Sequence, residues 1–456
     1  VSIAVALGFI LYNQLWKTTT NLPVIDNTEM KSIAVLAFTN MSSDENQDYF
    51  CDGIAEDILN DLVYIEDLRV AARTSSFAFK DKNIDIREIG KRLNVQTVLE
   101  GSVQKSGNTL RITVQLINVA DGYHMWSKRY DRELEDVFVI QNEIAQNIVQ
   151  ALKIKLSKKE KNNLEKIKTQ NIAAYDYYMR GRDYYSKGLY DKVLLSIPMF
   201  EKAIQIDPNY ALAYSGLADS YSELYMYYDR TEDNLKQTLK ASKKALELDP
   251  DLAESHTSRA IALFQNNQYE EAEKEFKAAI QLNSKLYQAY YQNARMFKSL
   301  GKTLEATELF EKASQVEPDK YLPLLFLTSS YDDLDMKDEM IIANKKTLKV
   351  LNKHLEFNPD DARAIYLGAG ALIKDNQPEM AIQWIEKAIL INPNEISVLY
   401  NATCIYSQLG RIDEALDYFE KAIEAGFASR NWIDNDTDLD NIRNHPRFEA
   451  SLKNME

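Results

Sequence analysis

The chain has 456 residues and a net charge of −15, with 45% apolar and 27% charged residues, as expected for a soluble globular protein of several domains. The acidic balance argues against a general nucleic-acid binder, because phosphate binding requires a basic surface. The scarcity of glycine (14) and proline (10) argues against a collagen-like or Pro/Gly-rich disordered chain. The only two cysteines, Cys51 and Cys404, are too far apart for a disulfide framework or a zinc finger.

Residues 1–17 are predicted to form a transmembrane helix that is truncated at its start. An apolar run is followed by aromatic residues and Lys17, an order that the membrane–water interface selects. Such a helix is about 24 Å long, shorter than the hydrocarbon core of about 30 Å, so we expect it to continue before Val1. The alternative is a signal-peptide core, although no clear cleavage site follows. Residues 18–30, which are polar and contain Pro23, are predicted to be a linker.

Residues 31–155 are predicted to form a small α/β unit. Short apolar or alternating runs predict strands, and apolar residues three or four positions apart predict helices. A Ser-Gly-Asn turn between two β-rich runs predicts a hairpin, and an Asp-Gly turn predicts a second one. The expected strands cover residues 32–38, 68–72, 97–104, 109–118 and 124–130, and the expected helices cover residues 50–64, 86–93 and 136–156.

Residues 156–170 are predicted to be a basic helical linker. The stretch KIKLSKKEKNNLEKIK is rich in lysine, so a nucleic-acid or lipid patch is one interpretation. Two glutamates interrupt the lysines and aromatic residues are absent, which favours an exposed helix that joins the two halves of the chain.

Residues 171–427 are predicted to form an array of about seven repeats. Acidic or amide residues precede a proline at intervals of 42, 68, 41 and 34 residues, and Ser284 divides the longest interval into two of 34. A period of 34 residues is the signature of the tetratricopeptide repeat, and the intervals of 42 and 41 are then 34 plus insertions. The five prolines, each expected to end the second helix of a repeat, are Pro208, Pro250, Pro318, Pro359 and Pro393.

Small and large residues alternate inside these repeats as helix packing requires. Alanines let two helices approach closely, and a Phe or Ile fills the space beside them. Gly188, Gly301 and Gly410 fall where the first helix of a repeat must end. The packing positions are Ala272, Phe276 and Ala279, then Ala306, Phe310 and Ala313, then Ala381, Ile385 and Ala388, and finally Ala415, Phe419 and Ala422.

The first half also resembles a known family. The runs IAVLAFTNMSSDENQDYFCDGIAEDIL, VAARTSSFAFKDKN and VLEGSVQKSGNTLRITVQLINVADGYHMWSKRYDR occur in the order found in the TolB-like amino-terminal domain, over roughly residues 31–150. One departure is Ala37, where the family usually carries a proline. AYDYYMRGRDYY resembles the first repeat after that domain, and NWIDNDTDLDNIRNHPRF within residues 428–456 resembles the family's capping segment. The resemblance implies a module found behind class III adenylate cyclase domains, CadC-type winged-helix regulators or kinases, with no activity of its own.

The fold class expected is therefore α/β plus all-α: a truncated transmembrane helix, a small TolB-like α/β domain, and an α-solenoid of about seven repeats. In tetratricopeptide proteins the first helix of each repeat lines a concave groove. Residues 171–456 carry a net charge of −13, yet four of the residues predicted in this groove are cations. Such cations favour an extended acidic peptide or a C-terminal carboxylate as the ligand. The alternative is that these residues are ordinary solvated faces. The predicted groove residues are Gln288, Tyr291, Arg295, Lys298, Arg363, Tyr366, Lys374, Tyr400 and Gln408.

No catalytic, cofactor-binding or metal site is predicted. The four histidines are isolated, and neither a Walker A loop nor a nucleophile elbow occurs. We predict no enzyme activity for the residues shown, while an adenylate cyclase or kinase domain before Val1 stays open for the full-length protein.

The leading functional prediction is a non-catalytic, single-pass membrane-tethered sensor region of a bacterial signalling protein, with a protein or peptide partner in the groove. We expect the soluble part to lie in the periplasm. The alternatives are a stand-alone anchored envelope scaffold, or the regulatory half of an adenylate cyclase or DNA-binding regulator whose effector domain precedes Val1. The sequence predicts no nucleic-acid partner and leaves the ligand, the membrane orientation and the oligomeric state open.

Overall fold

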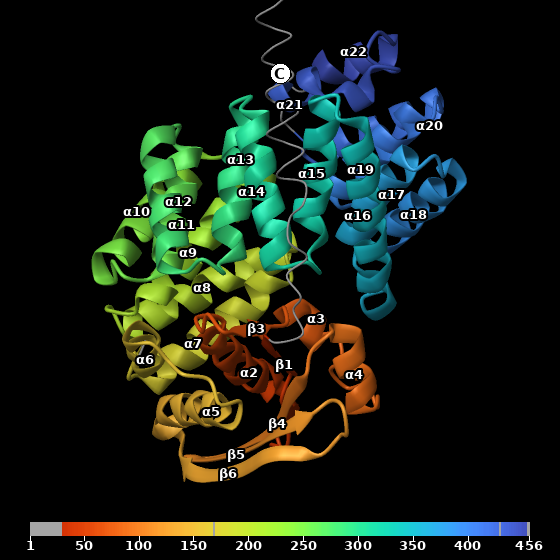
Figure 1. Cartoon of the computed structure of the whole chain (residues 1–456). Coiled ribbons are helices and arrows are strands. Elements are labelled where there is room, and N and C mark those ends of the chain that lie inside the picture. The colour runs from red at the N-terminus through yellow and green to blue at the C-terminus, as the bar shows by residue number, and fades with distance from the viewer. Residues whose placement is uncertain (1–29, 167–168, 428–429, 454–456) are drawn as a thin grey trace, which may run out of the picture.

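The computed structural model describes residues 30–166, 169–427 and 430–453. A small mixed sheet with its helices is followed by an array of paired helices (Figure 1). The predicted transmembrane helix over residues 1–17 and nearly all of the linker over residues 18–30 lie outside the described residues. Among the described helices, none combines the length and the apolar character needed to cross a bilayer.

The sheet has the strand order β3-β1-β4-β5-β6, with β2 paired beside β4. Strand β1 pairs in parallel with β3 and β4, whereas β4, β5 and β6 form an antiparallel meander. The strand predicted over residues 109–118 is confirmed as β5, whose alternate residues Leu110, Ile112, Val114 and Leu116 are all fully buried. The strands are β1 (Lys31–Val35), β2 (Thr39–Asn40), β3 (Leu68–Val70), β4 (Thr97–Ser106), β5 (Thr109–Asn118) and β6 (His124–Glu133).

Helices cover the two faces of the sheet unequally. Helices α2 (Asp48–Val63) and α5 (Val137–Ala151) pack on one face and share a continuous apolar core with β1, β4 and β5. Helix α4 (Ile86–Leu93) covers only the β1–β4 part of the other face. The short strand β2 and the one-turn helix α3 (Arg73–Phe77) were not predicted from the sequence.

The array consists of seven helix pairs within the described residues, numbered here as repeats one to seven. The predicted basic linker contains α6 (Lys158–Glu165), which begins with a capping box formed by Ser157 and Glu160. The pairs are α7 (Ile172–Ser186) with α8 (Tyr190–Ile206), α9 (Ala211–Glu223) with α10 (Glu232–Leu248), α11 (Ala253–Gln265) with α12 (Tyr269–Leu282), α13 (Tyr287–Ser299) with α14 (Thr303–Val316), α15 (Tyr321–Asp333) with α16 (Lys337–Phe357), α17 (Ala362–Lys374) with α18 (Pro378–Ile391), and α19 (Ile396–Gln408) with α20 (Ile412–Glu424). Helices α21 (Arg430–Asn435) and α22 (Pro446–Lys453) follow.

In six of the seven described repeats, the turn after the first helix uses a left-handed residue. Gly188, Gly301 and Gly410 have φ values of 61°, 73° and 70° there, as predicted. Asn267, Asp335 and Asn376 take the same conformation in repeats three, five and six. Repeat two differs, because α9 continues into a π-helical turn, η3 (Leu224–Tyr228). The insertion inferred from the 42-residue interval is therefore an extra turn between α9 and α10.

The predicted small–large packing inside the repeats is confirmed. The four alanine pairs and the three Phe and one Ile beside them are all fully buried. Since interiors are packed like organic crystals, a larger residue at such an alanine has no free space to occupy.

We therefore expect Ala306→Leu on α14 to lower the free energy of unfolding by about 1–3 kcal/mol through overpacking. Urea unfolding followed by circular dichroism measures this loss. Glu308→Ala, at an exposed position of the same helix, is the control and should change stability by less than about 0.5 kcal/mol. Equal denaturation midpoints for Ala306→Leu and the parent chain would show that the repeat register is wrong.

The α/β unit packs against the array through a buried polar network. Arg182 of α7 forms ion pairs with Glu56 and Asp57 of α2, and its side chain is only 16% exposed. Tyr175 of α7 donates to Asp57 and accepts from Gln141 of α5 at 2.7 Å. Burial alone raises the pKa of Glu56, but Arg182 and Arg73 outweigh it and hold the pKa below its ordinary value. The first repeat and the α/β unit therefore share one core.

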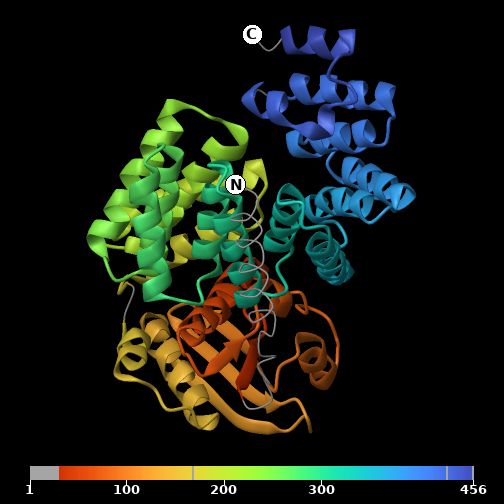
Figure 2. The same ribbon diagram turned by 45° about the horizontal axis from the view of Figure 1, so that its top comes forward.

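Later repeats also contact the α/β unit. The Lys285 ammonium, between α12 and α13, donates to the backbone carbonyls of Ile65, Glu66 and Leu68 at 2.6–3.0 Å. At repeat five, Phe357 packs on Phe79 with ring centroids 4.8 Å apart. The α/β unit thus lies along the rim formed by the loops between repeats, while α19, α20 and α22 rise away from it (Figure 2).

Candidate protein-binding groove

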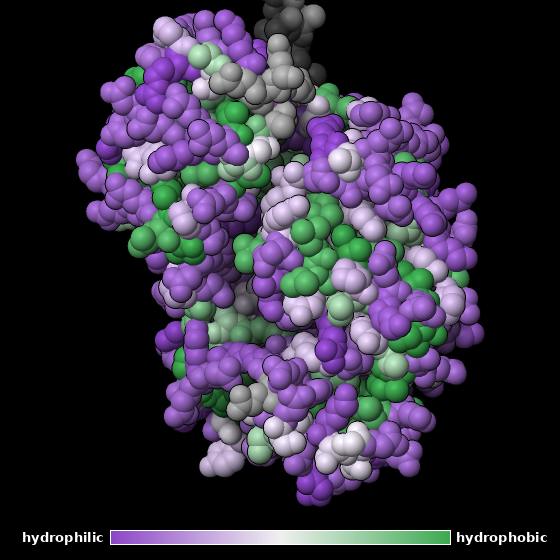
Figure 3. Space-filling model, turned by 180° about the vertical axis from the view of Figure 1, so that it is seen from behind, coloured by the Kyte–Doolittle hydropathy of each residue, from purple (hydrophilic) through white to green (hydrophobic). Residues whose placement is uncertain are grey.

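The first helices of the repeats face a common concave surface, the groove. Segments far apart in sequence meet there, because Tyr227 of η3 contacts both Arg295 of α13 and Arg363 of α17. The array therefore curls until its second, fourth and sixth repeats face one another. From behind, the molecular surface is hollowed beside the lobe of the last repeats (Figure 3).

A cluster of arginines and aromatic rings fills the centre of this groove. The Arg295 guanidinium carbon lies 5.6 Å from the ring centre of Tyr227, 5.7 Å from that of Tyr291 and 5.8 Å from that of Phe326. The Arg363 guanidinium carbon lies 5.8 Å from the Tyr227 ring centre. Distances below about 6 Å correspond to cation–π attraction, which is strongest when the pair is removed from water. Burial raises the pKa of Tyr291 to about 12.

Four of the nine predicted groove residues meet in or beside this cluster: Tyr291, Arg295, Arg363 and Tyr366. Tyr366 lies one turn after Arg363 on α17, and burial raises its pKa to about 12. Tyr291 is 4% exposed and packs with its ring centre 6.2 Å from that of Phe310, so it belongs to the repeat core as much as to the groove. Gln288 lies nearby and lines a hollow described below.

The other four predicted residues lie apart from the cluster. Lys298 pairs with Asp333 at 2.7 Å, and Lys374 pairs with Asp332, so each lysine has a carboxylate partner on the neighbouring α15. Tyr400 is 5% exposed and donates to Asp436 before η4, which makes it a contact to the end of the chain. Gln408 is the last residue of α19 and lies far along the array from the cluster. The row of cations expected from the sequence thus reduces to the two arginines.

A hollow of about 490 Å³ adjoins the cluster between α9, α11 and α13. Three carboxylates line it, from Asp219, Glu223 and Glu254. Burial raises the pKa of Asp219 to about 7, although Ser258 donates to it at 2.7 Å. Burial also raises the pKa of Glu223, while Arg363 and Arg295 act against that shift. Glu254 also accepts from Tyr64 of the α/β unit at 3.3 Å.

Sequence reasoning missed the residues of η3, which supply the centre of the cluster. Met226 accepts from Nη2 of Arg295 at 3.2 Å, and Tyr227 contacts both arginines. The available signal was the tyrosine-rich run YSELYMYYDR at the insertion in repeat two. Period analysis located the insertion, but it cannot say that the inserted turn points into the groove.

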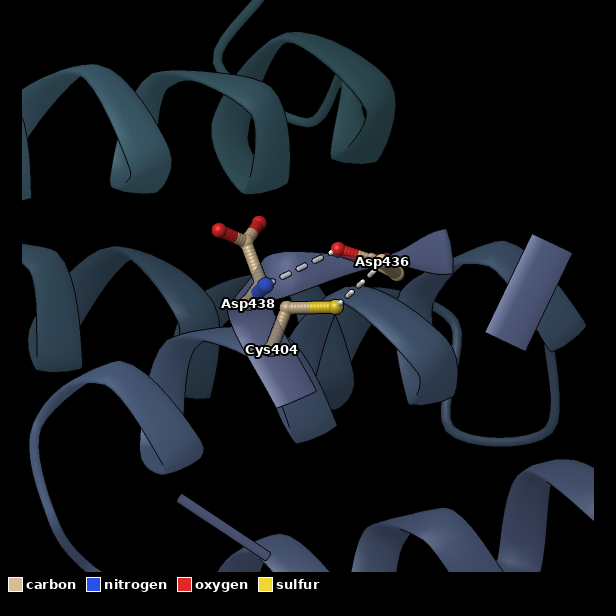
Figure 4. A group of neighbouring side chains, drawn as sticks. All are labelled: Cys404, Asp436 and Asp438. Carbon is tan, nitrogen blue, oxygen red and sulfur yellow. Dashed lines mark hydrogen bonds between the residues drawn. The ribbon is translucent and has the colours of Figure 1, made fainter. Parts of the chain in front are cut away.

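Cys404, Asp436 and Asp438 form one group whose ligand atoms lie within 4.8 Å of one another. Its contacts have a structural explanation, because one Asp436 oxygen accepts from the backbone N–H of Asp438 and the other from Tyr400 and Cys404. In Figure 4 the Asp438 carboxylate projects away from the Cys404 sulfur. Burial raises the pKa of Cys404, so this thiol is held in its protonated form. These features are those of a helix cap.

Two family models match parts of the helical array. The family model described as anaphase-promoting complex, cyclosome, subunit 3 matches residues 342–422, and a tetratricopeptide repeat model matches residues 241–274. The human IFIT1 dimer with m7Gppp-AAAA resembles the chain with a TM-score of 0.47 and 16% identity, over 70% of this chain and 75% of that chain.

Two curated relatives match over part of their length. "Putative adenylate cyclase 3" of Rhizobium meliloti (strain 1021) is 39% identical over 244 residues, which is 53% of this chain and 42% of the relative. "Anaphase-promoting complex subunit 3" of Schizosaccharomyces pombe is 24% identical over 183 residues, 40% of this chain and 26% of the relative. The chain thus spans less than half the length of these relatives. With its helix pairs and the matching repeat models, the chain is a tetratricopeptide-repeat protein that carries a small sheet domain before the repeats.

Proposed function

We propose that this chain is the partner-binding and sensing region of a membrane-tethered bacterial signalling protein, with the partner in the groove of the repeats. The observation that supports partner binding most directly is the Arg295–Arg363–Tyr227 cluster. Arginine and tyrosine are the residues that most often dominate binding energy in protein interfaces. A concave, continuous helical surface is also the form in which repeat arrays bind their partners.

Three further observations support the signalling part of the proposal. The relative with 39% identity is named a putative adenylate cyclase, and this chain matches less than half of it. The motifs within residues 31–150 resemble the TolB-like domain, which occurs behind such effector domains. The apolar run within residues 1–17 ends in aromatic residues and Lys17, which favours a membrane anchor. A periplasmic position for the rest of the chain follows only from the resemblance to the TolB-like family.

Site-specific photo-cross-linking in cells tests the binding surface. A photoreactive amino acid is placed at Gln288 or Gln292, which line the hollow, and at Glu271 or Glu308, which are exposed on the second helices. We expect one partner adduct of the same mass from both groove positions and no such adduct from the two controls. Adducts formed only from Glu271 or Glu308 would place the binding surface outside the groove.

Two separate experiments test the tether and the effector. Extraction of membranes with alkaline carbonate should leave the full chain in the pellet and release a chain that lacks residues 1–17. Translation of the codons before Val1 should reveal a cyclase, kinase or winged-helix domain. A start codon immediately upstream would instead favour the stand-alone envelope scaffold.

A further inference from the structure

Helix α16 is longer than the second helices of the neighbouring repeats. It has 21 residues, whereas α12, α14 and α18 have 14 each. This difference of seven residues equals the excess of the 41-residue interval between Pro318 and Pro359 over the period of 34. The insertion inferred in repeat five is therefore about two extra turns of α16.

The extra turns lie at the C-terminal end of α16. The helix begins two residues after the left-handed residue Asp335, just as α14 begins two residues after Gly301. The two helices thus start in the same register, and the extra residues are 351–357, called the extension from here on. In Figure 1 the lower end of α16 points towards α4 of the α/β unit.

The extension ends at Phe357, whose ring packs on the α/β unit. Its ring centre lies 4.8 Å from that of Phe79 and 4.3 Å from Nζ of Lys82. The Arg92 guanidinium carbon lies 5.8 Å from the same ring centre. Among the described residues of the array, Phe357 alone packs against the apolar cluster that α4 forms with β1 and β4. A ring that meets a second ring and two cations makes a specific contact rather than an incidental one.

A polar contact lies beside this ring. Asp319, in the loop before α15, accepts from Lys353 of the extension at 2.9 Å and from Ser75 of α3 at 3.1 Å. A hollow of about 330 Å³ remains between the two parts of the chain here. The contact differs in this respect from that of repeat one, which shares a continuous core with the α/β unit. Repeat five can therefore separate from the α/β unit without exposing a large core.

The extension also leads directly to the groove. Nε2 of His354, within the extension, lies 2.7 Å from a carboxylate oxygen of Asp361. Asp361 is the N-cap of α17, where it accepts from the backbone N–H of Ala364. Two residues after Asp361, Arg363 contacts Tyr227 of η3 across the groove. The seat of the extension on the α/β unit thus determines where α17 begins and how close it comes to η3.

We propose that the extension of α16 is a latch that closes the array onto the α/β unit and thereby sets the width of the groove. Repeat one is fixed to that unit by the shared core, and Lys285 holds the middle of the array. The latch brings repeat five back to the same unit, so the later repeats cannot swing outwards while it is closed. Its release lets these repeats uncurl and moves α17 away from η3. This inference goes beyond the proposed function, because it concerns the shape of the chain whether or not a partner is bound.

Distances between spin labels, measured by pulsed electron paramagnetic resonance on the full chain, test the latch. Arg230→Cys, just after η3, and Glu379→Cys on α18 carry the first pair of labels, which spans the groove. Lys236→Cys on α10 and Lys277→Cys on α12 carry the second pair, which lies within repeats two and three. All four positions are exposed, while both native cysteines are buried and therefore escape labelling.

Phe357→Ser should lengthen the distance across the groove by several ångströms and broaden its distribution, because the later repeats are then held only by their neighbours. The second pair should keep its distance. Phe357→Leu keeps an apolar side chain and should cause a smaller change. Ser75→Ala combined with Lys353→Met removes the polar part of the latch and should act in the same direction as Phe357→Ser. Glu356→Ser, exposed in the same turn, is the matched control and should leave both distances unchanged.

The outcomes separate the latch from the proposed function. An unchanged distance across the groove in Phe357→Ser and in the double variant overturns the latch, since the curl then depends on the helix pairs alone. An equal lengthening in Glu356→Ser also overturns it. If the second pair broadens in Phe357→Ser, that variant has lost its fold, and the double variant decides in the same way. Failure to cross-link a partner from the groove would contradict the proposed function without affecting these distances.

Discussion

Replacing Arg182 by methionine should lower the free energy of unfolding by about 3–5 kcal/mol, the range observed when one partner of a buried ion pair is removed. Methionine fills a similar volume but leaves the carboxylates of Glu56 and Asp57 without their main cation. Tyr175 and Arg73 remain as partners, but neither can replace the charge held between both acids. Because Arg182 lies on α7 and the acids lie on α2, the loss falls on the contact between the repeats and the α/β unit.

Chemical denaturation of the full chain, followed by circular dichroism and tyrosine fluorescence, measures this loss. Lys187→Met, at the residue that follows the same helix, removes an exposed ion pair with Asp183 and should cost less than about 1 kcal/mol. A second expected sign is a separate early transition, since the α/β unit loses its link to the first repeat. Equal losses for the two variants would mean that the Arg182 network contributes no more than a surface pair.

The repeat array could be predicted closely from the sequence because each of its signals is local. The prolines that end the second helices, the glycines that follow the first helices, and the buried alanines all act within one helix pair. The left-handed turns at Asn267, Asp335 and Asn376 were not predicted. Asparagine and aspartate adopt this conformation more often than most residues, but they are also common elsewhere, so they mark a helix end less specifically than glycine does.

The groove was predicted less completely, because its chemistry depends on contacts between distant repeats. Helical spacing predicted Arg295 and Arg363 on the groove face, and the structure brings both against Tyr227, yet the same spacing gave Lys298 and Lys374 equal status. Their pairing with Asp333 and Asp332 depends on the packing of α15 between α13 and α17, which spacing within one helix does not encode. The position of Tyr227 depends on how far the whole array curls, whereas the contacts around Arg182 depend on how the first repeat packs on α2 of the α/β unit.

The ionised Asp219 carboxylate in the hollow is expected to destabilise the folded protein. Burial raises its pKa to about 7, whereas in the unfolded chain the pKa stays near 3.8. Between these two values the folded state binds more protons than the unfolded state, so the free energy of unfolding falls as the pH rises from about 4 to 7. A shift of this size corresponds to a few kcal/mol once the carboxylate is charged in both states.

Asp219→Asn should therefore stabilise the chain by about 2–4 kcal/mol at pH 8 and by close to nothing at pH 4. The amide oxygen can still accept from Ser258, so the substitution removes the charge and keeps that hydrogen bond. Urea unfolding at several pH values gives the curve, and Asp251→Asn in an exposed loop should change stability by less than about 0.5 kcal/mol at each pH. A destabilising effect of Asp219→Asn at pH 8 would show that the charged carboxylate has a cationic partner within the folded chain. If the gain in the free energy of unfolding disappears between pH 7 and pH 4, the charge on Asp219 does not stabilise the fold. The folded chain then keeps a destabilising charge in the groove where the partner is expected to bind.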